Sequence, residues 1–172
     1  PPNTGISFVR TDLKKNNTIY ANYKNVSDTT LCTTISNEFG TKVSTIEHLM
    51  GAFYGMGIDN AYIEIDAQEV PILDGSARIF VESIKKSGIK VSDQPIKILK
   101  INNDIEINDK EKFISISKSN ITSDIEFEIR YDNKFIKNQK NKINVFEDDL
   151  EEIFSSRTFC LYEDIEKLKE IN

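Results

Sequence analysis

The sequence lacks long apolar runs, an excess of basic residues and a cysteine framework, and each absence removes a class of protein. No stretch approaches the roughly 18 consecutive apolar residues of a membrane-spanning helix, and residues 1–5 (PPNTG) do not begin a secretory signal. The formal net charge of -6 argues against nucleic-acid binding, because such proteins concentrate Lys and Arg. Cys32 and Cys160 are too sparse for a disulfide framework. We expect a cytoplasmic protein with reduced thiols, no membrane span and no nucleic-acid partner.

The chain is long and apolar enough to fold into one or two packed cores. It has 172 residues, of which 38% are hydrophobic, and no long polar tract. Residues 92–95 (SDQP) interrupt the pattern, since Pro and small polar residues continue neither a helix nor a strand easily. We therefore predict a first domain over residues 1–93 and a second over residues 94–172.

The first half predicts an α+β arrangement of strands and two helices. Residues 61–67 alternate apolar and polar side chains, as expected of a strand with one buried face. Ser44 and Glu47 fit a capping box, which predicts a helix that starts there and ends near Gly55 or Gly57. A second helix is predicted from a cap at Ser76 to a stop at Gly88. Shorter strands are expected at residues 7–10, 18–20 and 30–36.

The second half repeats this order and predicts a second, similar module. Residues 124–131 alternate apolar and charged side chains, which indicates a sheet with one solvated face and one face packed on helices. Residues 132–142 are lysine-rich and are expected to form a solvated loop. Each half should then be a two-layer α/β sandwich with an antiparallel-rich sheet. The other expected elements are strands at residues 96–101 and 113–117 and helices at 147–155 and 162–170.

The only histidine, His48, directly follows Glu47 in the first turn of the first predicted helix. At about 100° per residue the two point away from the apolar stripe that contains Leu49 and Phe53. Gly51 lies on their side one turn later and leaves open space there, at a cost of up to about 1 kcal/mol relative to Ala. By themselves these residues favour a capping carboxylate and a surface imidazole, because a catalytic zinc needs about three protein ligands.

Five segments in order resemble the UDP-3-O-acyl-N-acetylglucosamine deacetylases, the zinc amidohydrolases of lipid A synthesis. They are residues 31–34 (LCTT), 44–49 (STIEHL), 57–61 (GIDNA), 69–77 (EVPILDGSA) and 156–160 (SRTFC). Five ordered matches are far more specific than one short motif. The resemblance implies two similar α+β domains that hold zinc and substrate between them.

The resemblance also implies roles for individual residues. His48 would be a zinc ligand, and Glu47 the general base that deprotonates a metal-bound water for attack on the acetamide carbonyl. The Thr158 hydroxyl would stabilise the oxyanion, and Phe159 and Cys32 would lie at the substrate. From the residues alone, a helix cap or buried hydroxyl is the favoured interpretation of Thr158, and inert packing is that of Cys32.

The remaining family ligands for zinc, a histidine and an aspartate, and a catalytic histidine are expected beyond Asn172, and the opening strands before Pro1. The second domain and the first strands should thus be incomplete, and the chain alone inactive and a weak zinc binder. The expected substrate is a small UDP-sugar lipid, the protein a monomer and the organism Gram-negative. Two alternatives stay open: a non-catalytic relative that serves as a binding or scaffold module, and an unrelated α+β domain.

Overall fold

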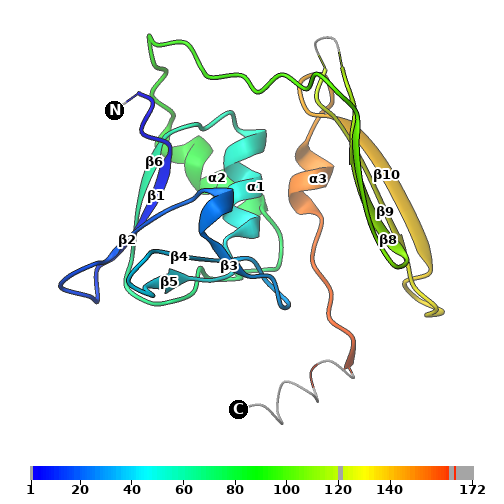
Figure 1. Cartoon of the computed structure of the whole chain (residues 1–172), viewed down its shortest axis with the longest axis horizontal. Coiled ribbons are helices and arrows are strands. Elements are labelled where there is room, and N and C mark those ends of the chain that lie inside the picture. Colours follow the sequence, from blue (N-terminus) through cyan, green and yellow to red (C-terminus); the bar gives the residue numbers. More distant parts are fainter. Residues whose placement is uncertain (1, 120–121, 163–164, 166–172) are drawn as a thin grey trace. The chain divides into compact units, whose positions relative to one another are not determined.

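A computed structural model of the chain describes residues 2–119, 122–162 and 165. The chain divides into two compact units, the first formed by residues 1–96 with 151–172 and the second by residues 97–150. The described residues form three α-helices and four small sheets, so the predicted mixed α+β class is confirmed (Figure 1). No helix among them is long and apolar enough to cross a membrane.

The first unit contains a sheet of three strands in the order β2, β1, β6. The central strand, β1 (Ile6–Arg10), is antiparallel to β2 (Thr18–Tyr20) and parallel to β6 (Ala61–Ile65). Every second residue of β6 is exposed, as its apolar and polar alternation predicts. In the middle of the sheet Phe8 pairs with Ile19, and both side chains are fully buried.

A second small sheet in this unit has the order β3, β4, β5. Its antiparallel strands are β3 (Val26–Asp28), β4 (Thr34–Ser36) and β5 (Lys42–Val43). A 3-10 helix at Tyr23–Asn25 leads into β3. Only the end of the strand expected at residues 30–36 is therefore regular, and its central residue, Ile35, is buried in the core.

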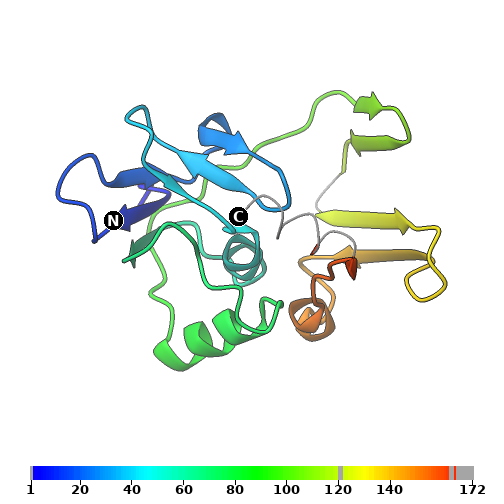
Figure 2. The ribbon, with the colours of Figure 1, turned by 90° about the horizontal axis from the view of Figure 1, so that it is seen from below.

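Helices α1 (Glu47–Gly55) and α2 (Arg78–Ser87) lie where the sequence predicts them. Figure 2 looks along α1, with β4 on one side of it and α2 on the other. The predicted apolar stripe of α1 is confirmed, since Leu49 and Phe53 belong to the core. Each such side chain contributes about 1.5–3 kcal/mol through its burial. The core is formed by Phe8, Ile19, Ile35, Val43, Ile46, Leu49, Phe53 and Val70.

The predicted capping box at the start of α1 is wrong. The N-cap is Ile46, which makes no side-chain cap. Ser44 Oγ instead accepts a hydrogen bond from Thr34 Oγ1 (3.0 Å), and Glu47 Oε2 accepts one from the Thr33 amide (3.0 Å). Both side chains of the expected box thus bind other residues, Thr34 at the start of β4 and Thr33 just before it, and these contacts replace the local cap.

The ends of α2 follow the prediction more closely. Ala77 occupies the N-cap position, one residue later than expected, but Ser76 Oγ still accepts a hydrogen bond from the Arg78 amide (3.2 Å). The helix ends before Gly88, whose φ of 80° and ψ of 163° lie in a region that only glycine adopts easily. Gly88 is therefore the stop that the sequence indicates.

The second unit consists of two antiparallel hairpins. The predicted strand at residues 96–101 is wrong, because that segment is irregular and the strand lies at residues 105–109. Residues 132–142 are a loop only in part, since β10 begins at Asn138 and pairs with β9. Lys140 and Lys142 form ion pairs across this hairpin with Glu126 (2.8 Å) and Asp124 (3.6 Å), so opposite charges favour the pairing. The strands are β7 (Ile105–Asp109), β8 (Lys112–Ile116), β9 (Asp124–Arg130) and β10 (Asn138–Asn144).

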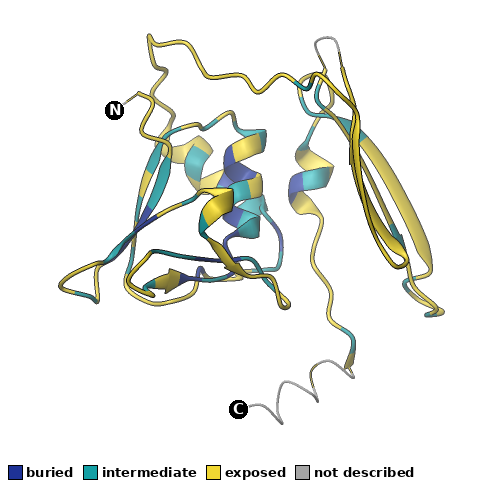
Figure 3. Ribbon diagram, in the orientation of Figure 1, coloured by how far each residue is buried: buried dark blue, intermediate teal, exposed yellow. Residues whose placement is uncertain are grey.

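The apolar side chains of these hairpins were expected to pack on helices, but they are exposed. Phe113 is 65% and Phe127 66% exposed, and Figure 3 shows β8, β9 and β10 as almost wholly exposed. Residues 97–150, as far as they are described, contain no helix. The helix expected at residues 147–155 begins only at α3 (Glu151–Ser155), and the one expected at 162–170 lies largely outside the described residues.

Candidate functional site

The start of α1 brings Glu47 and His48 together on one helical turn. Both are half-buried, whereas Leu49, the next residue, is buried in the core. Gly51 lies one turn further on and is exposed, and a Cβ atom added there would meet no atom within 4 Å. The surface of α1 is thus open beside the carboxylate and the imidazole, as the sequence predicts.

Two hydrogen bonds tie this turn to the segment that precedes β4. The Thr33 amide donates to Glu47 Oε2 (3.0 Å), and the Ile46 amide donates to the Thr33 carbonyl (3.4 Å). Next to Thr33, the half-buried Cys32 has its Sγ 3.7 Å from Thr34 Oγ1. The structure therefore brings Cys32 and Glu47, two of the predicted site residues, to the same segment. A carboxylate accepts several hydrogen bonds, so Glu47 is oriented by the amide and can still accept others.

Directly before this turn, Thr45 has an unusual backbone conformation. Its φ is 58°, which is a genuine outlier for a β-branched residue, and its side chain is only 5% exposed. Thr45 Oγ1 donates a short hydrogen bond to Glu69 Oε1 (2.6 Å), and the neighbouring Ser44 forms a bridge with Glu69. Strain of this kind persists only where surrounding contacts enforce it, and it is concentrated at functional sites.

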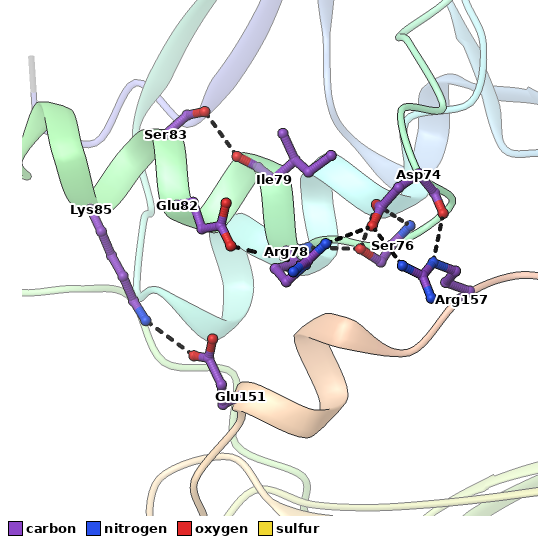
Figure 4. Close-up of polar contacts among 9 residues, drawn as sticks. All are labelled: Asp74, Ser76, Arg78, Ile79, Glu82, Ser83, Lys85, Glu151 and Arg157. Atoms are coloured by element: carbon purple, nitrogen blue, oxygen red, sulfur yellow. Dashed lines mark hydrogen bonds and ion pairs between the residues drawn. The ribbon is translucent and has the colours of Figure 1, made fainter.

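A second polar cluster surrounds Asp74, in the loop before α2 (Figure 4). Its carboxylate accepts hydrogen bonds from the Ser76 hydroxyl (2.6 Å), the Ser76 amide (3.2 Å), Arg78 Nη2 (3.2 Å) and Arg157 Nη2 (3.2 Å). The Ser76 hydroxyl above all, with the other donors, lowers the pKa of Asp74 to about 2. Asp74 is therefore an anion at any ordinary pH, and it binds both the start of α2 and the segment after α3.

Thr158 and Phe159 follow α3, and Thr158 lies beside this loop. The Thr158 amide donates to the Gly75 carbonyl (2.9 Å), and a Cβ atom added at Gly75 would lie 3.7 Å from Thr158 Cγ2. Thr158 is exposed, and Phe159 is 46% exposed. The hydroxyl of Thr158 is therefore not a buried one. Among the described residues no hydrogen bond joins Thr158 to Glu47 or His48, although all three belong to the first unit.

The described residues do not supply a complete metal site. They contain no group of three or more His, Cys, Asp or Glu side chains placed to hold a metal ion. His48 offers a single imidazole where a catalytic zinc needs about three protein ligands. The residues present here therefore do not fit zinc by themselves.

Comparison with known proteins relates this chain to a family of deacetylases. A model of the family "UDP-3-O-acyl N-acetylglycosamine deacetylase" (LpxC) matches residues 1–172. The chain belongs to this family. The resemblance found in the sequence is thereby confirmed.

Curated relatives show how much of the family's length the chain covers. UDP-3-O-acyl-N-acetylglucosamine deacetylases from three bacteria are similar to it. That of Syntrophus aciditrophicus is 40% identical over 166 residues, which are 96% of this chain and 52% of the relative. That of Chromohalobacter salexigens is 41% identical over 175 residues (100% and 57%), and that of Nautilia profundicola is 43% identical over 169 residues (98% and 56%). The chain thus spans about half the length of these relatives.

Sequence reasoning assigned no role to Thr45, Glu69, Asp74 or Arg157. The family resemblance could nevertheless have indicated them, because all four lie inside the segments that carry it. Their contacts join residues that are 24 positions apart for Thr45 and Glu69 and 83 apart for Asp74 and Arg157. Local patterns cannot reveal such partners.

Proposed function

We propose that this chain forms part of a zinc-dependent amidohydrolase that removes the acetyl group of UDP-3-O-acyl-N-acetylglucosamine. The reaction would commit this sugar lipid to lipid A in the cytoplasm of a Gram-negative bacterium. Family membership supports the proposal. The observation that carries it is the Glu47 carboxylate, which the Thr33 amide orients on the same open helical turn as His48.

In this proposal Glu47 is the general base. It takes a proton from the water whose oxygen attacks the acetamide carbonyl, and the C–N bond then breaks to give acetate and a free amine. The hydroxyl of Thr158 donates to the oxyanion, a role that requires an exposed and fixed donor. Thr158 is exposed, and its backbone amide is fixed on the Gly75 carbonyl.

His48 is proposed as one zinc ligand, with the others in the part of the relatives' length that this chain does not span. Zinc would polarise the carbonyl and lower the pKa of water. Phe159, with about half of its surface exposed beside Thr158, and Cys32, beside Thr33, are proposed to contact substrate. Two similar sandwich domains, residues 1–93 and 94–172, and a monomeric state stay predictions of the same proposal.

The test uses the complete protein encoded by the gene that contains this sequence. Zinc content and release of acetate from UDP-3-O-acyl-N-acetylglucosamine would be measured for the wild type, E47Q, E47A and H48A. E47Q keeps an oxygen that accepts from the Thr33 amide but cannot act as a base, so we expect kcat to fall by about 10²–10⁴-fold with zinc retained. H48A should lose zinc as well as activity.

Glu82, an exposed glutamate of α2, provides the matched control, and E82A should remain fully active. Wild-type activity in E47Q or in H48A would contradict the assigned roles. A complete protein with neither zinc nor turnover would support the alternative of a non-catalytic binding or scaffold module.

A further inference from the structure

Arg157 connects the segment after α3 to the loop before α2 by two hydrogen bonds to Asp74. Its Nε donates to the Asp74 carbonyl oxygen (3.0 Å), and its Nη2 donates to Asp74 Oδ2 (3.2 Å). The next residue, Thr158, donates its amide to the Gly75 carbonyl (2.9 Å). Two successive residues of one segment are therefore bound to two successive residues of the other, and Figure 4 shows the contact between Arg157 and Asp74.

Asp74 is itself held rigidly on the α2 side. The Ser76 hydroxyl and amide and Arg78 Nη2 all donate to its carboxylate. Ser76 is fully buried, and it also accepts from the Arg78 amide at the start of α2. The carboxylate that contacts Arg157 is thus anchored mainly by two hydrogen bonds from the buried Ser76.

We infer that Asp74 and Arg157 are positioning residues whose ion pair places the Thr158 hydroxyl for the reaction. This inference rests on the proposed function of Thr158. A donor that stabilises an oxyanion acts only when it is held in place, and a displacement of about 1 Å can cost about 10²-fold in rate. Thr158 is exposed on a segment that follows a helix of only five residues, so α3 alone fixes it poorly. The contacts to Asp74 and Gly75 supply the fixed attachment.

Arg78 offers a control that is matched in chemistry and distance. Its Nη2 lies 3.2 Å from Asp74 Oδ2, the same oxygen and the same distance as for Arg157. Arg78 belongs to α2, however, so its contact does not reach the segment that carries Thr158. Removing Arg78 weakens the surroundings of Asp74 but leaves the attachment of Thr158 intact.

The first measurement needs no activity and uses the complete protein. Hydrogen exchange of the Thr158 amide would be followed by NMR in the wild type, R157A, R157K and R78A. We expect R157A to exchange about tenfold or more faster at this amide and R78A less than about threefold faster, because local opening is governed by local contacts. R157K should resemble R157A, since lysine cannot reproduce the two directed contacts of a guanidinium. Unchanged exchange in R157A would overturn the inference.

The second measurement is kinetic and uses the complete protein. We expect R157A and D74N each to lower kcat by about 10–100-fold with KM changed less than about threefold, and R78A to stay within about threefold of the wild type. In a T158A background R157A should have little further effect, because both substitutions remove the same interaction. An equal, independent loss in that background would overturn the inference. Full activity of T158A would instead refute the proposed role of Thr158. The exchange experiment would still decide whether the ion pair between Asp74 and Arg157 orders the segment that carries Thr158.

Discussion

Replacing Thr45 by valine tests whether the strained residue before the Glu47–His48 turn is held by its hydroxyl. Valine has the same branched shape and should keep the φ of 58°, but it cannot donate to Glu69 Oε1 as Thr45 does at 2.6 Å. The substitution therefore removes one short hydrogen bond to a carboxylate and leaves the packing almost unchanged.

The expected magnitude follows from the surroundings of the two partners. A hydrogen bond to a charged group contributes about 1.5–3 kcal/mol to the free energy of unfolding. Thr45 is buried, but Glu69 is exposed and can regain water when the hydroxyl is lost, so the lower end of this range applies. We expect T45V to lower the free energy of unfolding by about 1–2 kcal/mol. T45S, which keeps the hydroxyl, should lose less than T45V.

The assay is urea unfolding of the chain, followed by circular dichroism, with a double-mutant cycle between T45V and E69Q. Because both substitutions weaken the same hydrogen bond, the double variant should be about as stable as T45V alone. A T45V variant as stable as the wild type, or strictly additive effects of T45V and E69Q, would refute the reasoning. In that case the φ of Thr45 would have to be fixed by the backbone contacts of Ser44 alone.

Two further predictions concern the open helix surface and acidic pH. G51A should raise the free energy of unfolding by about 1 kcal/mol, since alanine favours the helix and its Cβ meets no neighbour. If substrate occupies the space beside Gly51, G51A should also lower kcat/KM of the complete protein. Unchanged kinetics would argue against a substrate there. The pKa of Asp74 is lowered to about 2 from the ordinary 3.8, so on acidification the unfolded state takes up the proton first and stability falls as pH drops below about 5 toward 2. The difference in urea midpoint between the wild type and D74N should therefore be constant above about pH 5 and shrink toward pH 2, and a difference independent of pH would contradict this.

Much of the first unit follows from local sequence patterns. The alternation in β6 predicts a strand with one exposed face, and the apolar stripe of α1 predicts which side chains enter the core. Gly88 marks the end of α2 because its backbone conformation excludes other residues. These features depend on side chains a few residues apart, so the sequence is sufficient to predict them.

The second unit shows where such patterns fail. The lysine-rich stretch before Asn144 is predicted as a loop when it is considered alone, yet its second part is β10. Lys140 and Lys142 form diagonal ion pairs with Glu126 and Asp124 of β9, and these cross-strand charges make the stretch a suitable strand. Because a strand needs its partner, the propensity of one segment does not decide its conformation.

The sequence by itself determined the family, the helix that carries Glu47 and His48, and the order of the elements around it. Only the tertiary structure decided that Glu47 accepts from Thr33 rather than capping its own helix, and that Asp74 and Arg157 meet across 83 positions of chain. The physical reason is that hydrogen bonds and ion pairs depend on distances in space. A periodic pattern specifies which face of an element is buried, whereas the path of the whole chain specifies which polar groups come within about 3 Å of each other.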